Sequence, residues 1–395
     1  MLSKSPTSQI SPPPESELAP KSELGGQSSG YVPALDGLRA FAVFSVVAYH
    51  CRLLPYPGGL FGVDLFFALS GFLITGLLLK EFNTTASISI TTFYARRARR
   101  LLPALLVLVA SFTLAAWLLG WNWHQVLKEA ALSTFGVSNW ARAMDYRLPK
   151  TLGHLWSLSV EIQFCLLWAP LCYLVLRKWR SAEALFIFCI ILTLFVELHR
   201  RGLVSSEASI KRLYNGTDVR LNCFAIGGAV RALLMGERQL SQRARAVCSK
   251  YALWFGIVGL SVHLYLSSTV SIRAWSHTAF LSTAIALSCA AMIIGASMAP
   301  NALFARVLSL PPLRYIGQIS YGIYLWHYLL LKMIHLPGLG KPERSLLCIT
   351  ASVIAGTLSY YLVERHFLKR GAAPTSKLPP IKDAHSKEVE EAANQ

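Results

Sequence analysis

Long apolar segments separated by short polar stretches fill the chain between about residues 38 and 363. A stretch of about 20 apolar residues is long enough to cross a bilayer as a helix, and no segment alternates with the period of two that a barrel strand needs. This pattern predicts an all-α fold, a polytopic transmembrane helical bundle. The apolar segments are 38–54, 59–79, 101–121, 125–141, 154–176, 182–198, 219–236, 251–269, 277–298, 319–336 and 345–363.

Segment 125–141 is the weakest of them, because Lys128, Glu129 and Asn139 interrupt it. If it does not cross, about 10 spans remain with the N- and C-termini cytoplasmic, and 24 of the 38 Lys and Arg residues lie on the cytoplasmic side. If it did cross, the later basic loops would be inverted. Since cytoplasmic loops carry the excess of Lys and Arg, we predict ten spans, with 122–153 as an external segment that contains a re-entrant or interfacial helix.

Composition supports a membrane protein, with 54% hydrophobic and 15% charged residues. The net charge of +18 lies in loops between spans, where topology and anionic lipid headgroups explain it, so we expect the lipid bilayer as a partner and no nucleic acid. Eight scattered cysteines show neither zinc-ligand spacing nor a short disulfide framework, which favours buried apolar side chains.

The chain ends differ from the rest. Residues 1–33 are rich in Ser, Pro, Glu and Lys and have no A-x-A-like cleavage site, which predicts a disordered cytoplasmic tail and not a signal peptide. Residues 34–368 are the expected transmembrane domain, and 369–395 the expected polar cytoplasmic tail.

Arg39 and His50 lie eleven residues apart on the first apolar segment. A helix turns about 100° per residue, so their side chains share one stripe, roughly 16 Å apart along the axis. Ionisable groups are costly in lipid, which places this stripe against protein or a wet cavity. A neutral imidazole can act as a general base. Taken singly, Arg39 could be a charge anchor at a membrane face and His50 a structural histidine.

Two carboxylates are further candidates. Asp64, near the external end of the second span, could orient His50 or cap its own helix. Glu161 shares a helix face with His154 and Ser157, at i, i+3 and i+7, and could be functional or paired to an arginine for structure.

Arg97 and Arg100 belong to a group of four arginines that precedes the third span. On a helix they share a face, and guanidinium groups suit phosphate; contact with lipid headgroups is the alternative. Ser70 and Gly71 would let either a ligand or another backbone come close.

Tyr321, Tyr324 and His327 are spaced by three in the ninth span, as a substrate-binding seam or an interhelical hydrogen-bond seam would be. No Walker A, G-x-S-x-G, H-E-x-x-H or EF-hand spacing occurs, so we expect no metal site.

Taken in order, these motifs resemble the acyltransferase 3 family of integral membrane O-acyltransferases. The resemblance covers about residues 31–368. The chain departs from the family's pattern at Ile162, where many members have an acidic residue, and at Leu329, where proline is common. The matching motifs are Leu35–Ala40 with the spacing from Arg39 to His50, Gly62–Phe67 with Ser70–Ile74, Arg97–Pro103, His154–Glu161 and Ser320–His327.

The resemblance implies ten spans in a bacterial inner membrane and transfer of an acyl group, most often acetyl, from cytoplasmic acyl-CoA to a hydroxyl of a carbohydrate or glycoconjugate at the extracytoplasmic face. It implies no tightly bound cofactor, and the short C-terminal tail suggests a stand-alone member without an esterase-like domain. The rival hypotheses are an exporter of a glycan or lipid-linked sugar and a non-catalytic partner of a polysaccharide synthase.

The residue roles that follow are expectations of the same kind. His50 removes the acceptor proton or carries the acyl group, assisted by Arg39, Asp64 and Glu161. The donor would be bound by Arg97, Arg100, Ser70 and Gly71, and the acceptor by His154, Ser157, Tyr321, Tyr324 and His327.

Overall fold

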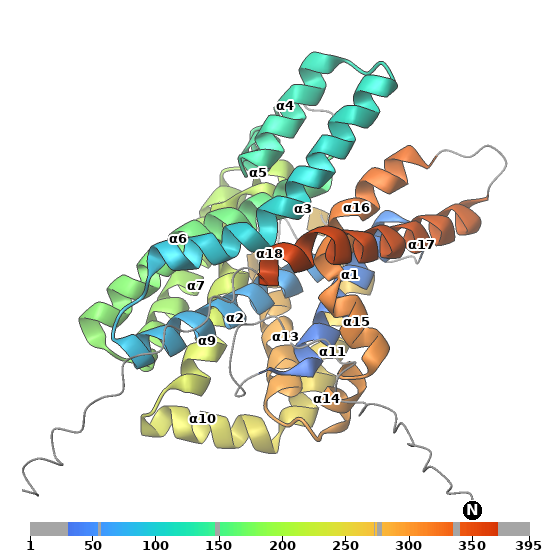
Figure 1. Ribbon diagram of the computed structural model, residues 1–395. Helices are drawn as coiled ribbons and strands as arrows, with labels where there is room; N and C mark the ends of the chain where they lie inside the picture. Colours follow the sequence, from blue (N-terminus) through green and yellow to red (C-terminus); the bar gives the residue numbers. More distant parts are fainter. Residues whose placement is uncertain are drawn as a thin grey trace, which may run out of the picture. The chain divides into compact units, whose positions relative to one another are not determined.

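Each of the ten segments expected to cross the membrane coincides with a helix in the computed structural model (Figure 1). The structure describes residues 31–53, 57–146, 151–271, 273–274, 279–334 and 340–369, and these contain helices and turns but no strand. The all-α polytopic fold is therefore confirmed. Val32–Phe367 form one compact unit. The tails predicted at 1–33 and 369–395 lie almost wholly outside the described residues.

The helices that match the ten expected spans are α1 (Pro33–His50), α2 (Gly62–Thr85), α3 (Ile90–Leu118), α6 (Trp156–Trp179), α7 (Ala182–Ser205), α9 (Leu221–Met235), α11 (Ala252–Thr269), α13 (Ala279–Ser297), α16 (Ser320–Met333) and α17 (Lys341–Ser359). The shorter elements are η2 (Gly59–Phe61), α4 (Trp123–Thr134), α5 (Ser138–Ala143), η3 (Gly153–Leu155), α8 (Ile210–Asn215), η4 (Thr217–Val219), α10 (Gln239–Lys250), α14 (Leu303–Leu308), α15 (Pro311–Gln318), a π-helical turn at Tyr360–Glu364 and α18 (Arg365–Lys369).

Among the described residues, seven helices are long and apolar enough to cross a membrane. They correspond to α2, α3, α6, α7, α11, α13 and α17. The other three expected spans coincide with α1, α9 and α16, which have 18, 15 and 14 residues. The expectation of a multi-pass membrane protein is confirmed.

Segment 125–141 does not form one continuous helix. It is divided between α4, of 12 residues, and α5, of six, and neither is long enough to cross a bilayer. Between them Gly136 has a φ of +67°, a left-handed conformation that favours glycine.

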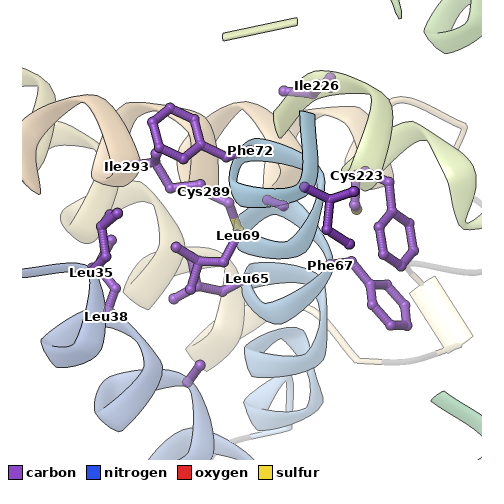
Figure 2. Packing of buried hydrophobic residues seen from close by; sticks show 14 of the residues in the cluster. Leu35, Leu38, Leu65, Phe67, Leu69, Phe72, Cys223, Ile226, Cys289 and Ile293 are labelled. Atoms are coloured by element: carbon purple, nitrogen blue, oxygen red, sulfur yellow. The ribbon is translucent and has the colours of Figure 1, made fainter. Parts of the chain in front are cut away.

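Helix α2 is packed on α1, α6, α9 and α13. Figure 2 shows Leu65 and Leu69 of α2 on the side facing Leu38 of α1, and Phe67 on the opposite side. The Phe67 ring stacks on Phe224 of α9, with ring centroids 4.5 Å apart. This packing fixes where the polar residues of α1 and α2 lie.

Candidate functional site

His50, the last residue of α1, meets His327 of α16. His50 Nδ1 lies 3.1 Å from His327 Nε2, and His327 Nδ1 lies 2.7 Å from the carbonyl oxygen of Tyr324. A carbonyl only accepts, so His327 Nδ1 carries the proton and, in the neutral ring, His327 Nε2 is an acceptor. His50 Nδ1 must then donate. The unprotonated Nε2 of His50 is left with a lone pair, as a general base requires.

Two more rings complete a cluster around this pair. The His154 ring centroid lies 5.2 Å from that of His327 and 5.2 Å from that of Tyr328, and Tyr328 lies 5.0 Å from His50. His154 Nε2 donates to the Leu325 carbonyl at 3.0 Å. His154 Nδ1 is buried, with no hydrogen-bond partner among the described residues. The structure thus brings together His50, His154 and His327 from three elements far apart in sequence.

The hydroxyl groups predicted to bind substrate are engaged by the protein. Tyr324 donates its hydroxyl to the His154 carbonyl at 2.7 Å, and Ser157 hydrogen-bonds the same hydroxyl. Tyr321 donates to the Leu101 carbonyl of α3 at 2.6 Å. These contacts form an interhelical hydrogen-bond seam, which was the alternative to a substrate-binding seam. Contact between these residues and substrate stays a prediction.

Asp64 forms a buried ion pair. Arg220 Nη1 donates to Asp64 Oδ1 at 2.8 Å, and each side chain is 1% exposed. The Cys223 thiol donates to the same oxygen at 3.2 Å. The partner of His50 is His327, and Asp64 makes no side-chain cap at the start of α2. The capping role of Asp64 is therefore corrected, and its assistance to His50 stays a prediction.

The three candidate arginines gather around Glu161. Glu161 lies within electrostatic reach of Arg39 of α1 and Arg97 of α3, and Arg100 of α3 lies within reach of both of these arginines. All three arginines are half-buried. Ser70 donates its hydroxyl to Glu161 Oε1 at 3.0 Å. Several fixed cations beside one carboxylate leave a positive excess, which suits an anionic ligand.

Gly71 has a packing role. A Cβ at this position would lie 2.1 Å from the carbonyl oxygen of Phe224, and one at Gly227 of α9 would lie 2.0 Å from that of Ala68. The two glycines thus let α2 and α9 approach each other closely. This close approach is the alternative interpretation of Gly71, and contact of Gly71 with a donor stays a prediction.

Residues 32–363 match the family described as the acyltransferase domain. The chain belongs to this family. It is 32% identical to the peptidoglycan O-acetyltransferase OatA of Listeria monocytogenes over 87% of this chain and 57% of that protein. It is also 32% identical to the O-acetyltransferase OatA of Staphylococcus aureus, over 92% of this chain and 61% of that protein. The chain therefore spans about three fifths of the length of these relatives.

The motif-based resemblance to the acyltransferase 3 family is thus confirmed, as is a multi-pass protein of a bacterial membrane. No solved structure matches the chain significantly. In this acyltransferase-family chain α1 runs unbroken from Pro33 to His50, so Arg39 and His50 do share one helix, as the spacing predicted. The arginine group, Arg39, Arg97 and Arg100, lies towards the start of α1. The imidazole cluster, His50, His154 and His327 with the Tyr328 ring, lies at its end.

Two residues of the site were missed from sequence. Arg220 is 1% exposed, and its guanidinium lies 5.1 Å from the Trp156 ring. Asp64 was the sequence signal that could have indicated Arg220, because a carboxylate inside an apolar segment requires a cation somewhere in the fold. Tyr328 directly follows the recognised motif that ends at His327. Its contact with His50 could not be predicted, because it depends on how α1 meets α16.

Proposed function

We propose that this chain is a membrane O-acetyltransferase that moves an acetyl group from acetyl-CoA to a carbohydrate hydroxyl at the extracytoplasmic face. The observation that carries the proposal is the hydrogen bond from His50 Nδ1 to His327 Nε2, which leaves His50 Nε2 free to take a proton. The names of the relatives make a peptidoglycan sugar the first acceptor to test.

The donor would enter at the arginine group. CoA carries its negative charge on phosphates, which guanidinium forks bind well. Arg39, Arg97 and Arg100 are half-buried, so their charges are fixed by the protein yet reachable. With the phosphates there, the acyl end of the donor would extend along α1 towards His50, roughly 16 Å away.

The transfer itself needs a base at the acceptor. His50 Nε2 removes the proton from the acceptor hydroxyl as its oxygen attacks the thioester carbonyl. The C–S bond breaks, the acetyl ester forms, and the CoA thiolate leaves and takes the proton from the imidazolium. His327 holds the imidazole by accepting from Nδ1. A general base contributes about 10²–10⁴-fold to the rate.

The test follows free CoA by chromatography. The chain in nanodiscs receives acetyl-CoA with or without peptidoglycan fragments. We expect acceptor-stimulated CoA release that falls about 10²–10⁴-fold in His50→Ala. His124→Ala is the matched control, because His124 is an exposed histidine on α4, and it should retain full release.

Two outcomes would contradict the proposal. Equal release by wild type and a folded His50→Ala variant would remove His50 from the chemistry. No release from folded wild-type protein, with any acyl-CoA and glycan tried, would favour the exporter, because a transporter does not consume a thioester.

A further inference from the structure

Two thiols meet beside the imidazole cluster. Cys51 directly follows His50 and caps α1, and Cys348 lies on α17. Cys51 is 6% exposed and Cys348 is fully buried. Their side chains are close enough to influence each other, although 296 residues separate them in sequence.

Neighbouring contacts hold the two cysteines in place. Ser345, one turn before Cys348 on α17, donates its hydroxyl to the Cys51 carbonyl at 2.7 Å. The Cys348 thiol donates to the His327 carbonyl at 3.7 Å. The end of α1, the middle of α16 and the first turns of α17 thus lie together at this pair.

The other buried cysteines are arranged differently. All eight cysteines are buried and free, as the sequence led us to expect. Cys172 and Cys189 influence each other electrostatically without a hydrogen bond between their thiols, and Cys223 donates to Asp64. Cys51 and Cys348 differ from these because the hydroxyl of Ser345, one turn before Cys348, also ties the Cys51 backbone to α17.

We propose that Cys51 and Cys348 are a redox modification site that closes to a disulfide and ties the end of α1 to α17 next to His50. The two thiols give up two protons and two electrons as the S–S bond forms. The oxidant is a disulfide, which takes up both and leaves as two thiols by exchange. In the orientation expected from the charge count this end of α1 is extracytoplasmic, where disulfides persist.

The proposal concerns thiol chemistry and does not rest on acetyl transfer. A cross-link that closes so long a loop restricts the unfolded chain strongly. We therefore expect the oxidised protein to unfold at a higher temperature than the reduced protein, and the increase to be absent in Cys348→Ser.

The test counts thiols in the full chain. Protein in nanodiscs is reduced, freed of reductant, exposed to oxidised glutathione, then denatured, alkylated and weighed. We expect wild type to lose two alkylatable thiols without gaining glutathione, and a non-reduced peptide map to join Cys51 to Cys348. Neither Cys51→Ser nor Cys348→Ser should lose two thiols or form an internal disulfide, because the remaining thiol either stays free or keeps one glutathione as a mixed disulfide. Cys248→Ser, which removes a buried cysteine elsewhere, should lose two like the wild type.

Three results would overturn the inference. Folded wild-type protein could keep all eight thiols after oxidation. The map could join a different pair, such as Cys172 and Cys189. Glutathione could stay attached to Cys51, which would show that Cys348 cannot reach it to complete the exchange.

Discussion

At the scale of single residues, His50 and His327 both carry the proton on Nδ1 but differ in what Nε2 faces. His327 has both nitrogens engaged, by the Tyr324 carbonyl and by His50, and it is fully buried. His50 is half-buried and has one nitrogen to spare. The motif that predicted His327 as a substrate ligand could not distinguish these situations, because they depend on a contact 277 residues away in sequence.

We predict that His327→Ala lowers kcat for acetyl transfer about fivefold with little change in KM, because an intramolecular hydrogen bond contributes about 1 kcal/mol. His327→Gln should recover part of the loss, since its amide oxygen can accept from His50 Nδ1. Steady-state kinetics with varied acceptor separate the two constants. A raised KM with normal kcat would instead indicate that His327 binds the acceptor.

The residue scale also shows where sequence reasoning ends. The spacing of Arg39 and His50 is local, and helical geometry alone placed them on one stripe. The partner of Asp64 is Arg220, 156 residues away, and no local pattern encodes that pairing. His50 and His327 were therefore each predictable as candidates, whereas the hydrogen bond between them was not.

At the scale of elements, the hydrophobic segments predicted the long helices because a buried or lipid-facing helix must be apolar along its whole length. The short helices α8, α10, α14 and α15 lie where loops were expected. They are stabilised by packing that sequence does not show: a Cβ at Gly317 of α15 would lie 1.9 Å from the Asp36 carbonyl of α1.

The close approach of α2 and α9 gives an element-scale prediction. Gly71→Ala places a methyl group against the Phe224 carbonyl and should destabilise the protein by about 1–3 kcal/mol, as overpacking does. Gly202→Ala is the control, because nothing lies within 4 Å of that position on α7, so stability should be unchanged or higher. Thermal unfolding in detergent measures both. A raised KM for acetyl-CoA without destabilisation in Gly71→Ala would indicate that Gly71 contacts the donor.

A second element-scale prediction concerns α4, which lies outside the seven candidate spans. Burial raises the pKa of Glu129 from its ordinary 4.5 to about 7, although the Leu152 amide donates to the carboxylate at 2.7 Å. A carboxyl group with a raised pKa in the folded state contributes stability that is complete below its unfolded pKa and lost as pH rises through its folded pKa. The loss therefore falls between about pH 4.5 and pH 7.

Glu129→Gln removes this titration and keeps an oxygen for the Leu152 amide. We expect its melting temperature relative to wild type to rise from pH 4.5 to pH 7 and to stay constant above. Glu237→Gln, an exposed substitution, should follow the wild type at every pH. A parallel pH course for Glu129→Gln and wild type would mean that Glu129 titrates normally.

At the scale of the whole molecule, orientation decides which compartment each end of the site faces. The described part of segment 122–153 reaches the cluster of His50, His154, His327 and Tyr328: a Cβ at Gly153 would lie 2.9 Å from the Arg142 guanidinium and 3.9 Å from the Tyr328 ring. The face on which this segment lies is therefore the face at which an acceptor would reach His50. The charge asymmetry of the sequence predicts that this face is outside, and that Arg39, Arg97 and Arg100, towards the other end of α1, lie on the cytoplasmic side.

This assignment can be measured with reporters. Alkaline phosphatase, which is active only outside the cytoplasm, should be active when inserted after Asp145 and inactive after Glu237, and a fluorescent protein at Gln395 should be bright. If segment 125–141 crossed the membrane despite its break at Gly136, both phosphatase results would reverse. The acetyl-CoA proposal would then lose its geometry, because the segment beside the imidazole cluster would face the donor's own compartment.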